Sequence, residues 1–128
     1  MSDSLQRLYD QVVSAKDADP AVSRTARLLR SGRAKMAKKL AEEAVEVVID
    51  AMNGEREAVV RESADLLYNL TVLWVSSDVH PDDVWGEMKR RERLLGIAEK
   101  VPKGMAAAES GSRRKVVLLD SRRARKRR

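Results

Sequence analysis

Apolar residues recur every three or four positions along this chain up to about residue 100, and no other feature restricts its fold as much. Leu5, Leu8 and Val12 show the pattern in the first segment. Positions three and four apart share one face of an α-helix, whereas a half-buried strand alternates at every second position. Glycine and proline, which interrupt helices, number only 6 and 3 among 128 residues. We therefore predict an all-α fold, an antiparallel helical bundle of four to five helices, at residues 3–16, 22–30, 33–52, 55–76 and from residue 80 onward.

The positive charge of the chain is concentrated at its C-terminal end. The chain has 26 Lys and Arg against 20 Asp and Glu, a net charge of +6, but residues 104–128 alone hold nine basic and two acidic residues. We predict one near-neutral domain at residues 1–103 and a basic, disordered C-terminal tail at residues 104–128. Without aromatic residues for base stacking, the tail is expected to make only weak, non-specific contacts with nucleic acid.

Composition also bears on the compartment. The chain has no cysteine, so it can form neither a disulfide nor a thiolate metal site. No apolar run approaches the roughly 20 residues that a membrane span needs, and the N-terminus lacks the order of a signal peptide. We expect a soluble, cytoplasmic protein with no membrane partner.

Acidic residues share one side of two consecutive predicted helices. Glu43 and Glu46 are three apart on the third predicted helix, and Glu62 and Asp65 are three apart on the fourth. Side chains at this spacing lie on the same side of a helix. Asn69 continues the second stripe within an otherwise apolar stretch. On the third helix, six apolar residues are predicted to face the interior, away from the charges: Met36, Leu40, Ala44, Val47, Val48 and Ala51.

These carboxylates predict a metal site. We expect them, with Glu42 alongside, to meet across a dry gap between the two helices, where a carboxylate is costly unless it is paired or binds a cation. Oxygen ligands without cysteine favour Mg²⁺, with Mn²⁺ as the alternative, over zinc or copper. In the competing interpretation, Arg61 or Lys39 neutralises the acids in an ordinary ion-pair network, and the sequence leaves this open.

A basic stretch precedes the acidic one. Because Mg²⁺ in proteins is often completed by substrate phosphates, the acidic cluster predicts a phosphate-bearing ligand. The N-terminus of the third helix itself attracts anions. We expect two or three of the following residues around Ser31-Gly32 to contact that ligand: Arg24, Arg27, Arg30, Arg33, Lys35, Lys38 and Lys39.

The run Glu42-Glu43-Ala-Val-Glu46, followed by Glu62-Ser-Ala-Asp65, resembles the EExxE…ExxD signature of the all-α nucleotide pyrophosphohydrolase superfamily. More narrowly, about residues 5–100 are similar to the phosphoribosyl-ATP pyrophosphohydrolase family. The narrower likeness rests on Ser23-x-Thr25, Leu28, Gly32, Lys35, Lys38-Lys39 and Ala64-Asp65-Leu66-Leu67-Tyr68.

The resemblance implies a helical bundle assembled as a homodimer, with the site near the subunit junction. It implies Mg²⁺-dependent hydrolysis of the α–β phosphoanhydride of phosphoribosyl-ATP, a nucleotide substrate, to phosphoribosyl-AMP and pyrophosphate, the second step of histidine biosynthesis. The implied metal ligands are Glu43, Glu46, Glu62 and Asp65. Glu42, Glu43 and Lys39 are the implied catalytic residues, and Arg27, Lys35, Lys38 and Asn69 the substrate-binding ones; which carboxylate acts as the base stays open.

The chain departs from the family's usual pattern at three positions. Asn69 replaces a usual histidine, Arg24 a usual tyrosine and Ala41 a frequent glycine. Asn69 cannot titrate, so a proton-transfer role at that position is absent. Two further hypotheses therefore stay open: a house-cleaning nucleoside triphosphate pyrophosphohydrolase of the same superfamily, and a non-enzymatic helical bundle that binds polyanions through its basic tail.

Overall fold

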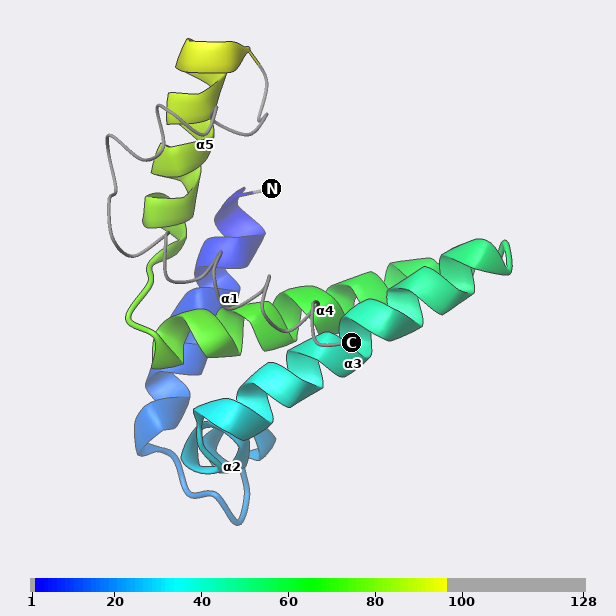
Figure 1. Ribbon diagram of the computed structural model, residues 1–128. Helices are drawn as coiled ribbons and strands as arrows, with labels where there is room; N and C mark the ends of the chain where they lie inside the picture. Colours follow the sequence, from blue (N-terminus) through cyan, green and yellow to red (C-terminus); the bar gives the residue numbers. More distant parts are fainter. Residues whose placement is uncertain (1, 97–128) are drawn as a thin grey trace, which may run out of the picture. The chain divides into compact units, whose positions relative to one another are not determined.

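The computed structural model describes residues 2–96 and is all-helical over that range (Figure 1). Its elements are α1 (Ser2–Ser14), the short 3₁₀ turn η1 (Ala15–Asp17), α2 (Arg24–Arg30), α3 (Arg33–Met52), α4 (Arg56–Ser76) and α5 (Pro81–Leu95). The all-α prediction with up to five helices is confirmed. Among these helices, none is long and apolar enough to cross a membrane. The domain boundary at residue 103 and the predicted tail at 104–128 lie outside the described residues.

Local sequence signals explain where the central helices begin and end. The Ser23 hydroxyl accepts a hydrogen bond from the Ala26 N–H at 3.0 Å and caps the start of α2. Gly32 then takes a φ of 101° between α2 and α3, and Gly54 takes a φ of 72° between α3 and α4. Both values lie in the region that glycine adopts without steric cost. The third predicted helix, 33–52, has the observed bounds of α3, and the fourth differs from α4 by one residue.

The first compact unit, residues 1–84, is organised around an antiparallel hairpin of α3 and α4, which run side by side along their length (Figure 1). At the open end of the hairpin, Arg33 Nη2 donates a hydrogen bond to the Ser76 carbonyl oxygen at 3.1 Å. α1 packs against α4, and α2 packs against α3 and α4. The hairpin is thus held at its open end by two further helices.

The hydrophobic core lies at this open end. Val12, Met36, Val72 and Val75 form the buried cluster, so α1, the start of α3 and the end of α4 contribute to it. Around them pack Leu8, Tyr9, Val13, Leu28, Leu29, Tyr68 and Leu73. No residue between Met36 and Asn69 is buried. This range forms the half of the hairpin that contains the turn between α3 and α4. The closed end of the hairpin is therefore a two-helix extension without a core of its own.

This extension exposes large apolar side chains. Val48 is 59% and Met52 is 81% exposed, and Val45, Ile49 and Val60 are also exposed. The prediction that Val48 and Ala51 face the interior is wrong, because α4 packs against the side of α3 that includes Glu43 and Val47 instead. Two packed helices can bury only one side of each other, which leaves the outer side of α3 in solvent.

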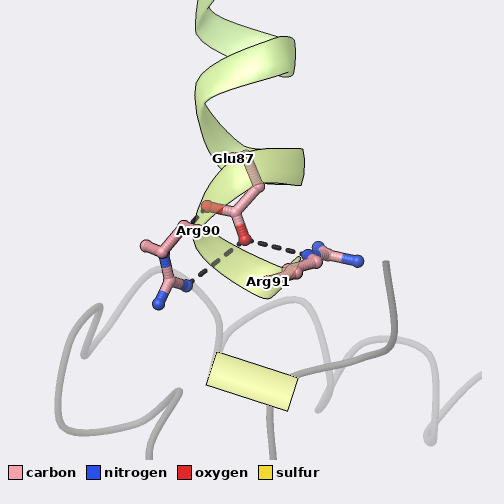
Figure 2. Close-up of polar contacts among 3 residues, drawn as sticks. All are labelled: Glu87, Arg90 and Arg91. Atoms are coloured by element: carbon pink, nitrogen blue, oxygen red, sulfur yellow. Dashed lines mark hydrogen bonds and ion pairs between the residues drawn. The ribbon is translucent and has the colours of Figure 1, made fainter. Parts of the chain in front are cut away.

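The second compact unit begins at Trp85 and contains the rest of α5. In it, one carboxylate accepts hydrogen bonds from two arginines (Figure 2): Glu87 Oε1 from Arg90 Nε at 3.1 Å, and Glu87 Oε2 from Arg91 Nε at 2.9 Å. The Arg91 and then the Arg90 hydrogen bond lower the pKa of Glu87 below its ordinary value, because both favour the charged carboxylate. Spacings of three and four residues make this cluster local to α5.

We predict that Val72→Ala lowers the free energy of unfolding by about 2 kcal/mol, because it removes apolar contacts and leaves a cavity in a packed core. Val72 is fully buried, whereas Val22 is 80% exposed. The matched control Val22→Ala is expected to change the same quantity by less than about 0.5 kcal/mol. Urea unfolding followed by circular dichroism measures both, and equal losses would contradict the position of the core.

Candidate active site

The antiparallel pairing of α3 and α4 brings carboxylates from both helices together. Arg33 pairs with Ser76 at the open end, so residues farther along α3 lie opposite residues earlier in α4. Glu43 thereby comes to lie opposite Glu62 and Asp65, which are one helical turn apart. One carboxylate oxygen from each of the three lies within 4.8 Å of the other two. This arrangement could hold a cation between two helices.

The carboxylates are less buried than the sequence predicts. Glu43 and Glu62 are half-buried, and Asp65 is exposed. The prediction of a dry gap is therefore wrong for the single chain. The core lies elsewhere, and the cluster is in the half of the hairpin where no residue is buried. The expected meeting of the acids across two helices is nevertheless present among Glu43, Glu62 and Asp65.

The neighbouring carboxylates shift the pKa of one member of the cluster. The pKa of Glu62 is raised above its ordinary value, first by a hydrogen bond shared with the Glu43 side chain, then by burial and by the charges of Glu46, Glu43 and Asp65. A hydrogen bond between two carboxyl groups needs a proton on one of them. A cation between these carboxylates would relieve the same repulsion.

Glu46 and Glu42 lie at the edge of this cluster. Glu46 is near enough to raise the pKa of Glu62, but it is not among the three carboxylates that meet within 4.8 Å. Glu42 is exposed and lines a groove together with basic residues of α2 and α3. The two residues therefore flank the three-carboxylate cluster on the exposed side of α3.

The basic groove, as we call this feature, has a volume of about 600 Å³. It is lined by Arg24, Arg27, Leu28 and Ser31 from α2 or its end, and by Lys35, Lys38, Lys39 and Glu42 from α3. Within residues 2–96, none of these three lysines makes an ion pair. Several uncompensated cations along one groove provide a binding surface for a polyanion.

The ion-pair alternative finds no support in the described part of the chain. Neither Lys39 nor Arg61 pairs with the clustered carboxylates there. The i, i+4 pairs Lys38–Glu42 and Lys39–Glu43, which a solvated helix face would form, are also absent from residues 2–96. Cations and carboxylates remain separated along α3 instead of neutralising each other.

Asn69 is buried one turn beyond Asp65, at 2% exposure. Its Nδ2 donates a hydrogen bond to the Asp65 carbonyl oxygen at 2.9 Å, and its Oδ1 has no hydrogen-bond partner among the described residues. The predicted stripe Glu62, Asp65, Asn69 therefore runs from the exposed cluster into the core.

Sequence reasoning named Arg24 among the basic residues but left it out of the substrate-binding set. In the structure, Arg24 lines the groove, and its guanidinium lies 5.4 Å from the centroid of the Tyr68 ring. The signal was present in the spacing: residues 24, 27, 28 and 31 follow the i, i+3, i+4, i+7 pattern of one helix face. A helix of seven residues gave that pattern too little length to stand out.

A carboxylate cluster on one helical hairpin, beside a groove lined by arginine and lysine, defines an all-α protein in which acidic and basic surfaces adjoin. The sequence model of the phosphoribosyl-ATP pyrophosphohydrolase family matches residues 5–92. The chain belongs to this family and is a hydrolase.

Relatives match the chain over most or all of its length. It is 66% identical over the whole of both chains to phosphoribosyl-ATP pyrophosphatase 2 of Rhodopseudomonas palustris, and 64% identical over 99% of both chains to the protein of the same name in Bradyrhizobium diazoefficiens. Phosphoribosyl-ATP pyrophosphatase of Gluconobacter oxydans is 56% identical over 75% of this chain and 72% of its own. The resemblance inferred from the carboxylate signature is confirmed at the level of the family.

We predict opposite effects on stability from two glutamate-to-glutamine changes. Because the folded pKa of Glu62 is raised, its ionised form destabilises the fold above the ordinary value of 4.5, so Glu62→Gln should raise the free energy of unfolding at pH 7. Because the folded pKa of Glu87 is lowered, its ionised form stabilises the fold, so Glu87→Gln should lower that free energy.

Both differences should shrink as the pH falls below the pKa values of each glutamate, since protonated glutamate and glutamine are then alike in charge. Urea unfolding of the chelator-treated proteins between pH 7 and pH 3 measures this. A loss of stability in Glu62→Gln at pH 7 would instead support the ion-pair alternative.

Proposed function

We propose that this protein hydrolyses the α–β phosphoanhydride of phosphoribosyl-ATP in the presence of Mg²⁺, which is the second step of histidine biosynthesis. Water adds across the anhydride, and the products are phosphoribosyl-AMP and pyrophosphate. The observation that supports this most is the position of the carboxylate cluster beside the basic groove on α3, in a chain of the phosphoribosyl-ATP pyrophosphohydrolase family.

The residues of the cluster fit a hard divalent cation. Every donor is a carboxylate oxygen, the three central donors lie within 4.8 Å of each other, and Glu62 takes up a proton more readily than an isolated glutamate. Such oxygen donors suit Mg²⁺, with Mn²⁺ as the alternative. We assign Glu43, Glu62 and Asp65 as ligands, with Glu46 as the fourth from the edge of the cluster. When bound, the cation neutralises negative charge on the phosphates.

The basic groove receives the phosphates in this proposal. Arg27, Lys35 and Lys38 bind them, and Lys39 neutralises the charge that develops as the anhydride breaks. Arg27 is already oriented, since its Nη1 donates a hydrogen bond to the Pro20 carbonyl oxygen at 2.7 Å. The prediction that Asn69 binds substrate stays a prediction.

Glu42 and Glu43 are the candidate groups for handling the attacking water. Glu42 lines the basic groove, where it is next to the phosphates, while Glu43 belongs to the cluster. We assign Glu42 to orient the water and accept its proton, a role that needs a carboxylate in hydrogen-bond reach of the water. The proton moves to the carboxylate as the water oxygen bonds to phosphorus and pyrophosphate leaves.

A homodimer completes the proposal. Val45, Val48, Ile49, Met52 and Val60 are exposed on the half of the hairpin that also holds the carboxylates. A second copy packed on this half would cover the apolar side chains and remove water from the cluster. The dry surroundings that the sequence leads us to expect would then arise at the subunit junction.

We predict that the purified protein with Mg²⁺ converts phosphoribosyl-ATP to phosphoribosyl-AMP and pyrophosphate, and that Asp65→Asn lowers kcat/KM at least about a hundredfold, because a charged ligand becomes neutral. Helix content by circular dichroism should stay unchanged, since Asp65 is exposed. Asp10→Asn, at an exposed acid of α1, is the control and should keep full activity.

Release of pyrophosphate, measured by a coupled assay with and without chelator, decides this prediction. Intact phosphoribosyl-ATP after incubation with the Mg²⁺-loaded protein would refute the proposal. A parallel set of ordinary and damaged nucleoside triphosphates tests the house-cleaning alternative.

We predict that the protein sediments as a dimer, and that Val48→Glu shifts it toward the monomer by placing a charge within an apolar contact. Val48 is 59% and Val22 is 80% exposed in the single chain, so both substitutions are tolerated by the monomer fold. Val22→Glu is the control and should leave the dimer intact. Analytical ultracentrifugation measures the masses, and a monomeric unsubstituted protein would contradict the dimer.

A further inference from the structure

The basic groove has one short wall, which Leu28 and Leu29 of α2 attach to the core. α2 contributes Arg24, Arg27 and Leu28 to the groove, but the helix has only seven residues. Helices of this length are unstable on their own and depend on tertiary contacts. The position of these cations relative to the carboxylates of α3 and α4 is therefore set by what fastens α2 to the hairpin.

Tyr68 of α4 makes two contacts with consecutive residues of α2. Its hydroxyl is hydrogen-bonded to the Thr25 hydroxyl at 2.6 Å, across a sequence separation of 43 residues. Its ring lies 5.4 Å from the Arg24 guanidinium carbon, a cation–π distance. One side chain of α4 thus contacts α2 at two consecutive residues, and one of them is a groove cation.

The same side chain lies one turn from the carboxylate cluster. Tyr68 follows Asp65 by three residues on α4, which contributes no side chain to the lining of the groove. Tyr68 therefore connects the helix that bears the acidic cluster to the helix that bears part of the basic groove.

We propose that Tyr68 is a positioning residue for the polyphosphate: through Thr25 and Arg24 it holds α2 at the spacing from α3 at which one pyrophosphate-bearing ligand contacts both walls of the groove. This inference rests on the proposed function of the groove. Like charges on the two walls repel each other before ligand binds, and the Thr25–Tyr68 hydrogen bond opposes the resulting separation. Binding then needs less ordering of α2, which strengthens it.

A purely structural role predicts something different. The Tyr68 ring packs against the core cluster, so a large truncation would destabilise the fold whatever the hydroxyl does. Tyr68→Phe keeps the ring, its packing and the contact with Arg24, and it removes only the hydroxyl. Thr25→Val removes the other partner of the same hydrogen bond with little change in shape.

The test compares these two variants, their combination and a matched control. We expect Tyr68→Phe and Thr25→Val each to raise KM for phosphoribosyl-ATP about three- to tenfold, the range that one lost hydrogen bond gives, with kcat within twofold. The KM of the double variant should be no higher than that of either single variant, because both substitutions remove the same hydrogen bond. Thr71→Val is the control: that hydroxyl is buried and donates to the Leu67 carbonyl oxygen within α4 at 2.8 Å, so KM should not change.

Unchanged KM in both single variants, additive effects in the double variant, or an equal rise in Thr71→Val would each overturn the inference. Binding of inorganic pyrophosphate to the chelator-treated protein, measured by calorimetry, tests the positioning role separately from the proposed function. The binding measurement needs neither hydrolysis nor metal. If the unsubstituted protein does not hydrolyse phosphoribosyl-ATP, weaker pyrophosphate binding by Tyr68→Phe still supports the positioning role. Equal binding by the two proteins, or none by the unsubstituted one, overturns it.

Discussion

Repulsion between carboxylates on α3 and α4 is the interaction around which this protein is organised. Helix pairing brings Glu43 to Glu62 and Asp65, with oxygens within 4.8 Å. The hydrogen bond with Glu43, then burial and the neighbouring charges, raise the pKa of Glu62. Stability alone would favour a lysine or an apolar residue at one of these positions. Among residues 2–96, the nearest lysines instead have no ion-pair partner and lie in the adjacent groove. In the proposed function, a cation and a polyphosphate would relieve both excesses of charge at once.

The hairpin tolerates this repulsion because the clustered carboxylates lie outside its buried core. Val12, Met36, Val72 and Val75 hold the open end together, where Arg33 also ties α3 to the end of α4. The carboxylates lie in the half without buried residues, where acids retain contact with water. Placing the unfavourable charges away from the core keeps their cost small in the unliganded protein.

The sequence predicted the helix bounds and the meeting of the acids well, and the exposure of side chains poorly. The bounds of α3 follow from periodicity and from Asn53-Gly54, and the meeting of Glu43 with Glu62 and Asp65 follows from helical spacing plus a short turn. The exposure of side chains could not be derived in the same way. Val48 was expected inside because it is apolar, but the sequence does not show which side of α3 faces α4.

The contact between Thr25 and Tyr68 shows the same limit. It joins residues 43 positions apart, and no spacing rule within one helix indicates it. Thr25 and Tyr68 were visible only as residues of a family-like pattern, without a physical reason for their identity. The structure supplies that reason, since two hydroxyls that meet between α2 and α4 restrict both positions.

The order of charges along α3 argues that this helix is arranged for binding at the expense of its own stability. A helix dipole is positive at the N-terminus, where it favours acids, and negative at the C-terminus, where it favours bases. α3 has no acid in its first turn and no base in its last, and its lysines precede its glutamates. The unpaired N–H groups of the first turn therefore add to the charge of Lys35 and Lys38 toward an anion. The C-terminal carbonyls add to the negative field of the carboxylates. Each half of α3 thus gathers charge of one sign, and a ligand that spans both halves must bring phosphate to one end and a cation to the other.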